Sequence, residues 1–251
     1  MLKRNNFLNK SAIILEARTQ SKRFPNKIFK KIGNYTLLHF LLKRLSRLKN
    51  IKTIVATTKN PKDKKIINFC KKNHYPFFVG KENDLIDRVL NCSKKYKIEN
   101  IISLTSDNPL VDIKYISKYL NIFYKRKLDY LDNIQSNTFP KGMAIRIVKR
   151  TKLKKFSKFV KKTKDYNYRQ HTCFFFMQKK NFKYFRGYFA KSLRYSEYKN
   201  LRLTVDYKED LELINQLSKN NNFDIYVSLK EVINMWRKSL KSNKSLTKVI
   251  L

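Results

Sequence analysis

The sequence is poor in glycine, proline, cysteine and acidic residues. With 4 glycines and 5 prolines in 251 residues, it is neither collagenous nor a flexible or low-complexity chain. Its 3 cysteines, Cys70, Cys92 and Cys173, are an odd number without the spacing of a metal module. This argues against a disulfide framework, and we expect a cytoplasmic protein in a reducing environment.

Long apolar stretches are also missing from the chain. No run approaches the roughly 18 apolar residues that a membrane-spanning helix needs. The basic N-terminus is followed by an apolar run from Ser11 that breaks at Glu16 and Arg18, too short for the core of a signal peptide. We therefore expect neither a membrane span nor a secretion signal.

Positive charge and aromatic side chains are abundant instead. The chain has 58 Lys and Arg against 18 Asp and Glu, a formal net charge of +40, and 14% of its residues are aromatic. A hydrophobic share of 42% is enough for a core and argues against disorder. We expect one domain over residues 1–251, with its core at about 11–240, a basic N-terminal tail and a polar C-terminal tail.

The charge by itself would suit a nucleic-acid partner, because Lys and Arg neutralise phosphates and release counterions. The excess is mostly Lys rather than Arg, however, and it is spread along the whole chain. Asn and Ile are also abundant, as in proteins from AT-rich genomes. We therefore expect a solvated, Lys-rich surface and no nucleic-acid partner, with a functional polyanion-binding surface as the alternative.

Short apolar runs alternate with amphipathic segments in the first half of the chain. Runs at 11–17, 51–57 and 100–105 lack internal alternation, as strands buried in a parallel sheet do. Segments 35–48 and 112–126 carry apolar residues at helical spacing. This order predicts βαβ units and an α/β fold with a mainly parallel sheet flanked by helices.

The pattern is looser after Asp129. Three further strands are predicted there, at 143–148, 172–177 and 201–205. Three further helices are predicted at 151–162, 209–217 and 229–240.

A basic loop follows the first predicted strand. Within ten residues it carries four cations and two hydroxyls: Arg18, Lys22, Arg23, Lys27, Thr19 and Ser21. Open α/β sheets bind ligands at the carboxyl ends of their strands, so such a loop is well placed to surround a triphosphate. The alternative is an ordinary basic loop of a Lys-rich protein.

Two aspartates stand just after other predicted strands. Asp107 follows the run at 100–105 and Asp206 follows the run at 201–205. A carboxylate at a strand end can hold a divalent cation against ligand phosphates. The alternative is a structural role as a turn residue or a helix cap, which is the role we expect for Asp112.

Taken together, these segments resemble the cytidylyltransferases of the spore-coat-polysaccharide type, relatives of acylneuraminate and 3-deoxy-manno-octulosonate cytidylyltransferases. The resemblance runs from about Ala12 to Leu217. It rests on several motifs in the family's order: IILEARTQSKRFPNK (13–27), ATTKNPKD (56–63), GKENDLIDR (80–88), TSDNPLVD (105–112) and LRLTVDYKEDLELI (201–214). Asn26 stands where the family usually has Gly, and Asn tolerates the left-handed backbone that such a turn needs.

The resemblance implies a Rossmann-like, glycosyltransferase-A-type sheet and a homodimer. It also implies transfer of a cytidylyl group from CTP to an acidic sugar or related acceptor, with release of pyrophosphate, in surface-polysaccharide biosynthesis. The implied site residues are Arg18 and Lys27 for catalysis, Ala17, Ser21, Lys22 and Arg23 for the nucleotide and its phosphates, and Asp107 and Asp206 for Mg²⁺.

One segment departs from the family. The pattern YPDGLDVEV appears here as residues 139–147, with Lys141, Ala144 and Arg146 in place of acidic residues. Either the acceptor is anionic or activity is impaired. For an anionic acceptor we expect contacts with Lys141, Arg146, Arg169 and His171. A packed structural histidine is the alternative for His171, and a non-catalytic nucleotide- or polyanion-binding derivative is the alternative for the whole chain.

Overall fold

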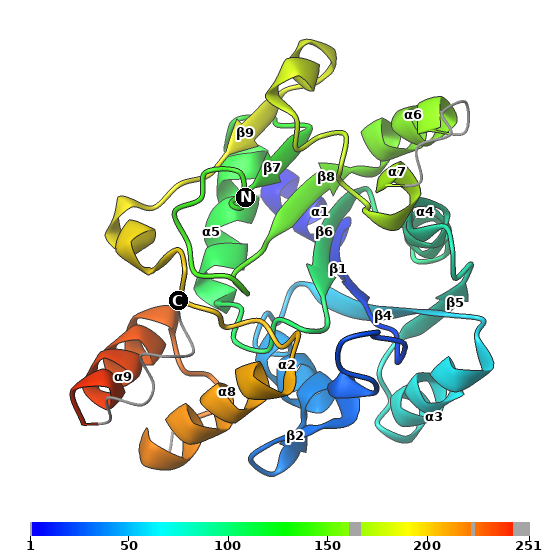
Figure 1. The fold of residues 1–251 in the computed structure, drawn as a ribbon. Helices are drawn as coiled ribbons and strands as arrows, with labels where there is room; N and C mark the ends of the chain where they lie inside the picture. The colour runs from blue at the N-terminus through cyan, green and yellow to red at the C-terminus, as the bar shows by residue number, and fades with distance from the viewer. Residues whose placement is uncertain (1, 161–166, 222–223, 243–251) are drawn as a thin grey trace.

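A seven-stranded sheet with helices on both faces forms the centre of the computed structural model, which describes residues 2–160, 167–221 and 224–242 (Figure 1). The strand order is β5-β4-β1-β6-β8-β7-β9. The strands are β1 (Ser11–Glu16), β4 (Lys52–Thr58), β5 (Phe77–Gly80), β6 (Asn100–Thr105), β7 (Tyr130–Asp132), β8 (Arg146–Lys149) and β9 (Gly187–Phe189). The first four are mutually parallel, and β8 runs antiparallel to β6 and β7. The predicted α/β fold with a mainly parallel sheet is confirmed.

The helices connect and cover these strands. They are α1 (Leu2–Asn9), α2 (Leu37–Leu45), α3 (Lys64–Lys72), α4 (Leu85–Lys95), α5 (Ile113–Lys125), α6 (Arg150–Val160), α7 (Asn167–Gln170), α8 (Lys208–Asn221) and α9 (Leu229–Ser242). A small hairpin of β2 (Lys31–Ile32) and β3 (Tyr35–Thr36) precedes α2. Asp112 caps α5 by accepting the Lys114 backbone N–H at 2.9 Å, as expected.

Both faces of the sheet are buried, and β1 shows why its sequence lacks alternation. Ile13 and Leu15 belong to one hydrophobic cluster, and Ala12 and Ile14 belong to the other. Because successive side chains of a strand point to opposite faces, an apolar run is what a central strand covered on both sides requires. This places the carboxyl ends of β1 and β6 side by side at one edge of the sheet.

The strand predicted at 172–177 is wrong. Turns occupy this segment, in which Phe176 and Met177 both donate their backbone N–H to the carbonyl oxygen of Cys173. Its aromatic side chains pack on α6, where the rings of Phe156 and Phe175 stack with centroids 4.2 Å apart. They do not belong to a strand that pairs in the sheet. Aromatic residues favour strands because they pack well, and here packing is satisfied without sheet pairing.

The strand predicted at 201–205 is also wrong as a member of the sheet. Its backbone bonds to loops: Lys141 donates to Leu201, Leu203 donates to Lys141, and Val205 donates to Asp107. The alternating burial of this extended segment produced the strand pattern, although only an isolated bridge forms there. Its pairing with the Asp107 loop matters for the site described below.

The chain ends differ from the expected tails in one respect. The N-terminal segment is the helix α1 rather than a tail, while residues 243–251 lie outside the described part. The strands β7 and β9 were not predicted, since each has only three residues. Among the described residues, no helix has both the length and the apolarity needed to cross a bilayer. The extent of one domain over 1–251 stays a prediction.

Candidate active site

A cavity of about 330 Å³ opens at the carboxyl ends of β1 and β6. Its walls come from the loop after β1, the start of α4, the loop after β6, the segment around Asp206, and α7 with the residues that follow it. Ligands of open α/β sheets bind at this edge, where the connecting loops separate and leave a crevice. Most of the predicted site residues meet here.

A buried carboxylate, that of Asp63, fixes the position of the loop after β1 (residues 17–27). Asp63, which is 1% exposed, accepts the backbone N–H and the hydroxyl of Thr19, each at 2.7 Å, and the hydroxyl of Thr58. Asn26 has φ +55°, so the left-handed turn expected at this position is present. A fixed loop backbone presents its side chains to the cavity with little loss of entropy on binding.

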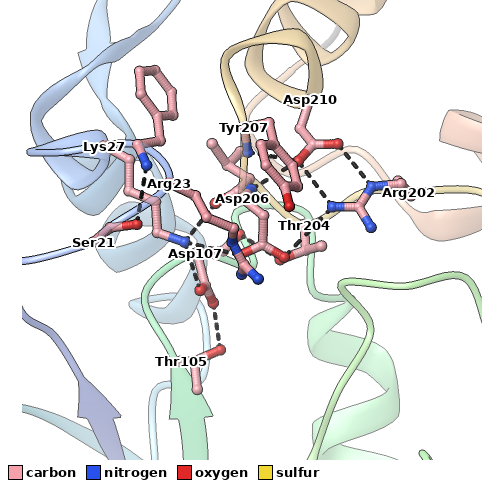
Figure 2. A network of polar contacts seen from close by, with 12 residues as sticks. Ser21, Arg23, Lys27, Thr105, Asp107, Arg202, Thr204, Asp206, Tyr207 and Asp210 are labelled. Carbon is pink, nitrogen blue, oxygen red and sulfur yellow. Dashed lines mark hydrogen bonds and ion pairs between the residues drawn. The ribbon is translucent and has the colours of Figure 1, made fainter. Parts of the chain in front are cut away.

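Lys27 lies between the two predicted metal ligands. Its ammonium nitrogen donates to Asp107 Oδ2 at 2.9 Å, to Asp206 Oδ1 at 3.2 Å and to the Val205 carbonyl at 2.7 Å (Figure 2). All three donors of the ammonium are thereby used, and Lys27 is only 8% exposed. Three segments far apart in the sequence therefore converge on a single cation.

Asp206 is held in place by a second carboxylate. Asp210 accepts the backbone N–H groups of Asp206 and Tyr207 at 2.8 and 2.9 Å, and the guanidinium of Arg202 at 2.9 Å (Figure 2). Within the described residues, the carboxylate of Asp206 contacts the side-chain cations of Lys27, Arg23 and Arg202 rather than the backbone N–H groups of α8, so it is not a helix cap. Burial alone would raise the pKa of Asp206, but Lys27 and Arg23 outweigh it and lower the pKa, so this carboxylate is ionised.

Asp107 is fixed by contacts on both sides. Its Oδ1 accepts the Thr105 hydroxyl at 2.6 Å, which leaves Oδ2 for Lys27. Its carbonyl oxygen accepts the backbone N–H of Val205 at 2.8 Å and thereby ties the loop after β6 to the Asp206 segment. The two carboxylates are consequently preorganised around one cation position.

The donor set at this position suits Mg²⁺. Two carboxylates already share one positive charge, the Lys27 ammonium. Magnesium prefers oxygen ligands and is commonly bound through one or two carboxylates together with substrate phosphates and waters. Within the described ranges, no cluster of three or more His, Cys, Asp or Glu could hold a metal. A nucleotide would thus have to supply the remaining ligands.

The cations of the 17–27 loop take different positions. Arg18 is exposed, lines the cavity and has no ion pair with any residue that the structure describes. Arg23 pairs with Asp206 at 2.7 Å. Lys22 is exposed and is not among the lining residues. Ala17 and Ser21 line the cavity, and the Ser21 hydroxyl also accepts the Phe24 backbone N–H at 3.3 Å.

A second cavity, of about 380 Å³, adjoins the first. Glu16, Thr105 and His171 line both, and Arg146 reaches the second one from β8. The buried Nε of Arg146 has no hydrogen-bond partner in the described part of the chain. Burial and then the nearby Arg146 lower the pKa of His171, which favours the neutral imidazole.

The predicted acceptor residues do not all gather there. Arg169 and His171 line the first cavity, and Arg146 and His171 line the second. Lys141 lines neither: it is exposed, and its backbone is engaged with Leu201 and Leu203. The prediction for Lys141 therefore has no geometric support.

Sequence analysis assigned no function to three residues that shape the site. Besides Asp63, Glu82 accepts from Gln20 Nε2 at 2.9 Å and Asn60 Nδ2 at 3.0 Å, which joins two loops at the cavity rim. Arg88 lines the cavity, is 4% exposed and donates to the Lys81 carbonyl. Asp63, Glu82 and Arg88 all lie in segments 56–63 and 80–88, two of the motifs that resemble the family. Their place in these motifs is the signal that could have identified them.

A cavity at the carboxyl edge of a mainly parallel sheet, with cations around two aspartates, is typical of proteins that bind nucleotides. The family model for cytidylyltransferases matches residues 12–232. The chain belongs to the cytidylyltransferase family and is a nucleotidyltransferase that uses CTP.

Two relatives match the chain over most of its length. An uncharacterised protein of Methanocaldococcus jannaschii, MJ1063, is 31% identical over 228 residues, 90% of each chain. The spore coat polysaccharide biosynthesis protein SpsF of Bacillus subtilis is 25% identical over 91% of this chain and 94% of its own.

Solved structures share the fold. A cytidylyltransferase from Leptospira borgpetersenii superposes with a TM-score of 0.79 at 28% identity, covering 93% of this chain and 94% of its own. A CMP:2-keto-3-deoxy-manno-octonic acid synthetase complexed with CTP superposes with a TM-score of 0.61 at 14% identity, covering 84% of this chain and 99% of its own. The latter likeness is one of fold alone.

Proposed function

We propose that the protein is a Mg²⁺-dependent enzyme that transfers the cytidylyl group of CTP to a small anionic acceptor and releases pyrophosphate. The observation that carries the proposal is the convergence of Lys27, Asp107 and Asp206 in a cavity that Arg18 also lines. In so basic a chain, random substitution would not be expected to keep two carboxylates at one cation position. A non-catalytic polyanion-binding derivative explains the charge but not this arrangement.

The chemistry sets what the cavity must do. An acceptor oxygen bonds to the α-phosphorus of CTP while the bond to the β-phosphate oxygen breaks, so negative charge grows on the leaving pyrophosphate. Arg18 and Lys27 are the cations placed to stabilise this charge more in the transition state than in the ground state. A magnesium ion held by Asp107 and Asp206 would further neutralise the phosphate oxygens.

Lys27 has to change partners in this proposal. Its ammonium occupies the position that both carboxylates would offer to a metal ion. We infer that Lys27 exchanges the carboxylates for phosphate oxygens when the nucleotide and Mg²⁺ bind. At the aspartates a divalent ion would then replace a monovalent one, and the negative charge of the bound triphosphate would offset the added positive charge.

The second cavity is the proposed acceptor site. It adjoins the nucleotide cavity through Glu16, Thr105 and His171, so an acceptor there would lie beside the phosphates. Arg146 offers it a guanidinium with an unpartnered buried Nε, which suits a carboxylate or phosphate on the acceptor. The resemblance to SpsF supports a surface polysaccharide as the destination of the product.

The proposal extends to assembly and location. A homodimer is supported by large exposed hydrophobic side chains near β9, Tyr184 at 60% and Leu193 at 79% exposure. Light scattering coupled to gel filtration would give the mass of a dimer if this is correct. The scarcity of cysteine and the buried state of all three thiols suit a reducing cytoplasm.

The nucleotide preference tests the proposal first. Melting temperatures are measured with CTP, UTP, GTP and ATP, each with and without Mg²⁺, because a ligand of the folded state raises the melting temperature. We expect a shift selective for CTP with Mg²⁺. Equal small shifts for all four nucleotides, independent of Mg²⁺, would instead support the polyanion-binding alternative.

Turnover then tests the site. Pyrophosphate release from CTP is measured with a panel of acidic sugars, including N-acetylneuraminate and 3-deoxy-manno-octulosonate. Asp107→Asn and Asp206→Asn are expected to lower the rate at least 100-fold, because each removes a charge from the metal position. Asp224→Asn, an exposed aspartate at another place in the chain, is the matched control. Persistent turnover in both site variants would refute the assignment.

A further inference from the structure

A third concave surface, of about 360 Å³, lies between α4 and α6, with α7 at one end. Figure 1 shows these three helices gathered on one side of the molecule, beside the sheet. Five cations line this α4–α6 groove: Lys94 from α4, Arg150, Lys154 and Lys158 from α6, and Arg169 from α7. They come from three separate elements, so the cluster is not a single Lys-rich run of sequence.

The two carboxylates of the groove make their contacts with other groups than these five cations. Asp84 and Asp87 also line it, but Asp84 accepts the backbone N–H of Asp87 as the cap of α4. The carboxylate of Asp87 lies 3.7 Å from the ammonium of Lys81, which is not among the lining residues of the groove. In residues 2–160, 167–221 and 224–242, no ion pair involves any of the five cations.

Arg150 adds a buried donor to the cluster. Its Nε is inaccessible to solvent and has no hydrogen-bond partner in the described part of the chain. As a lining residue, Arg150 contributes to the groove a guanidinium that has no ion pair within the described residues. Unpaired like charges in a concavity also repel one another and focus a positive potential into it. A bound anion would reduce this repulsion.

We propose that the α4–α6 groove binds an oligophosphate, a ligand with two or more linked phosphoryl groups. Arg150, Lys154 and Lys158 are four residues apart on α6, so they follow one another along the helix at steps of about 6 Å. A chain of phosphoryl groups can contact more of them at once than a single phosphate can. Arg169 lines both this groove and the nucleotide cavity. The two sites are therefore neighbours that share one guanidinium, a statement that rests on the proposed function of the first cavity.

The test titrates inorganic tripolyphosphate into the protein by calorimetry at moderate salt. Lys154→Ala/Lys158→Ala removes two groove cations, and we expect its affinity at the groove to fall at least tenfold. Lys114→Ala/Lys118→Ala on α5 is the matched control, since it removes two exposed lysines at the same helical spacing. We expect the control to change the affinity less than twofold. An equal loss in both double variants would mean that overall charge attracts the polyanion, and would overturn the proposal.

Two further measurements separate this inference from the proposed function. The thermal shift with CTP and Mg²⁺ should be the same in Lys154→Ala/Lys158→Ala as in the wild type. A lost shift would mean that these lysines belong to the nucleotide site, and would overturn the proposal of a separate oligophosphate site. Arg169→Gln should weaken both the tripolyphosphate affinity and the CTP shift. An effect on the CTP shift alone would show that Arg169 does not contact the ligand of the groove. If the wild type shows no CTP response but keeps the groove site, the proposed function fails and the oligophosphate site stands.

Discussion

At the scale of single residues, Lys27 links the sequence motif to the chemistry of the site. The motif places it at the end of the basic loop, where it would be expected to point to phosphates. In the structure its ammonium is bound by two carboxylates and a carbonyl and is almost completely buried. A buried lysine is stable only when its charge is matched, and Asp107 and Asp206 provide that match.

Lys27→Met should therefore change metal binding as well as catalysis. Without the ammonium, the two carboxylates repel each other and offer an open cation position, so Mn²⁺ binding in the absence of nucleotide should tighten at least tenfold. Electron paramagnetic resonance of free Mn²⁺ measures this directly. Lys30→Met, an exposed lysine three residues further on, is the control. Equal Mn²⁺ affinities in the wild type and Lys27→Met would show that the lysine does not occupy the metal position.

Asp63 is a positioning residue for the 17–27 loop rather than a ligand. Its buried carboxylate accepts three donors, two of them from Thr19. In Asp63→Asn, an amide N–H₂ must face one of those donors, which should cost about 1–3 kcal/mol of folding free energy. We expect a lower melting temperature together with a smaller CTP shift. An unchanged CTP shift in a destabilised variant would limit Asp63 to a purely structural role.

At the scale of elements, the C-terminal helix α9 is tied to the sheet domain by a buried arginine. Arg44 of α2 is 1% exposed and donates to the carbonyl oxygens of Val111 at 3.1 Å, Val227 at 2.9 Å and Ile225. Burial lowers its pKa to about 10, which still leaves it charged at neutral pH. Asp112 adds a second tie by accepting the Leu229 backbone N–H at 3.0 Å.

Arg44→Met should loosen this junction. Carbonyl oxygens that now accept from the guanidinium would lose their donor inside the protein, which should cost about 3 kcal/mol. For a chain of this size the melting temperature should fall by roughly 10 °C. Hydrogen exchange would localise the effect to α9 if the tie is as described. Lys43→Met on the same helix should cost less than about 1 kcal/mol, and an equal loss there would contradict the account.

At the scale of the whole molecule, stability should depend on pH through two histidines. Burial lowers the pKa of His39, with Lys43 adding to the effect, and burial and Arg146 lower the pKa of His171. The folded state therefore resists protonation that the unfolded chain accepts near pH 6.5. Stability is greatest above that value and decreases as pH falls from 6.5 towards the lowered pKa values.

Urea unfolding at pH 7.5 and 5.5 measures this dependence. We expect the wild type to be less stable at pH 5.5, and the double variant His39→Asn/His171→Asn to lose much of the difference. Asp206 and Asp210 do not account for the same window, since their pKa values are lowered from an already acidic value. An equal pH dependence in the double variant would show that the histidines do not cause it.

Local sequence predicts a structural element correctly where the residues of one segment determine it by themselves. The apolar runs of β1, β4 and β6 predicted the sheet because burial on both faces leaves no alternation. Capping by Asp112 and the left-handed Asn26 follow from the chemistry of single side chains. Residues 172–177 and 201–205 were misjudged because their apolar residues are buried by other segments, and no local pattern distinguishes that from pairing in a sheet.

The sequence by itself thus determined the α/β fold, the family and the residue types of the site, because periodicity and motif order are properties of contiguous segments. Only the tertiary structure decided which of these residues meet. Lys27 contacts carboxylates 80 and 179 positions away, Arg146 reaches a cavity that Lys141 does not, and the groove cations gather from three helices. Such convergence depends on the order of the strands in the sheet and on how the loops pack at its edge. Both are set by contacts between distant segments, so no single segment determines them.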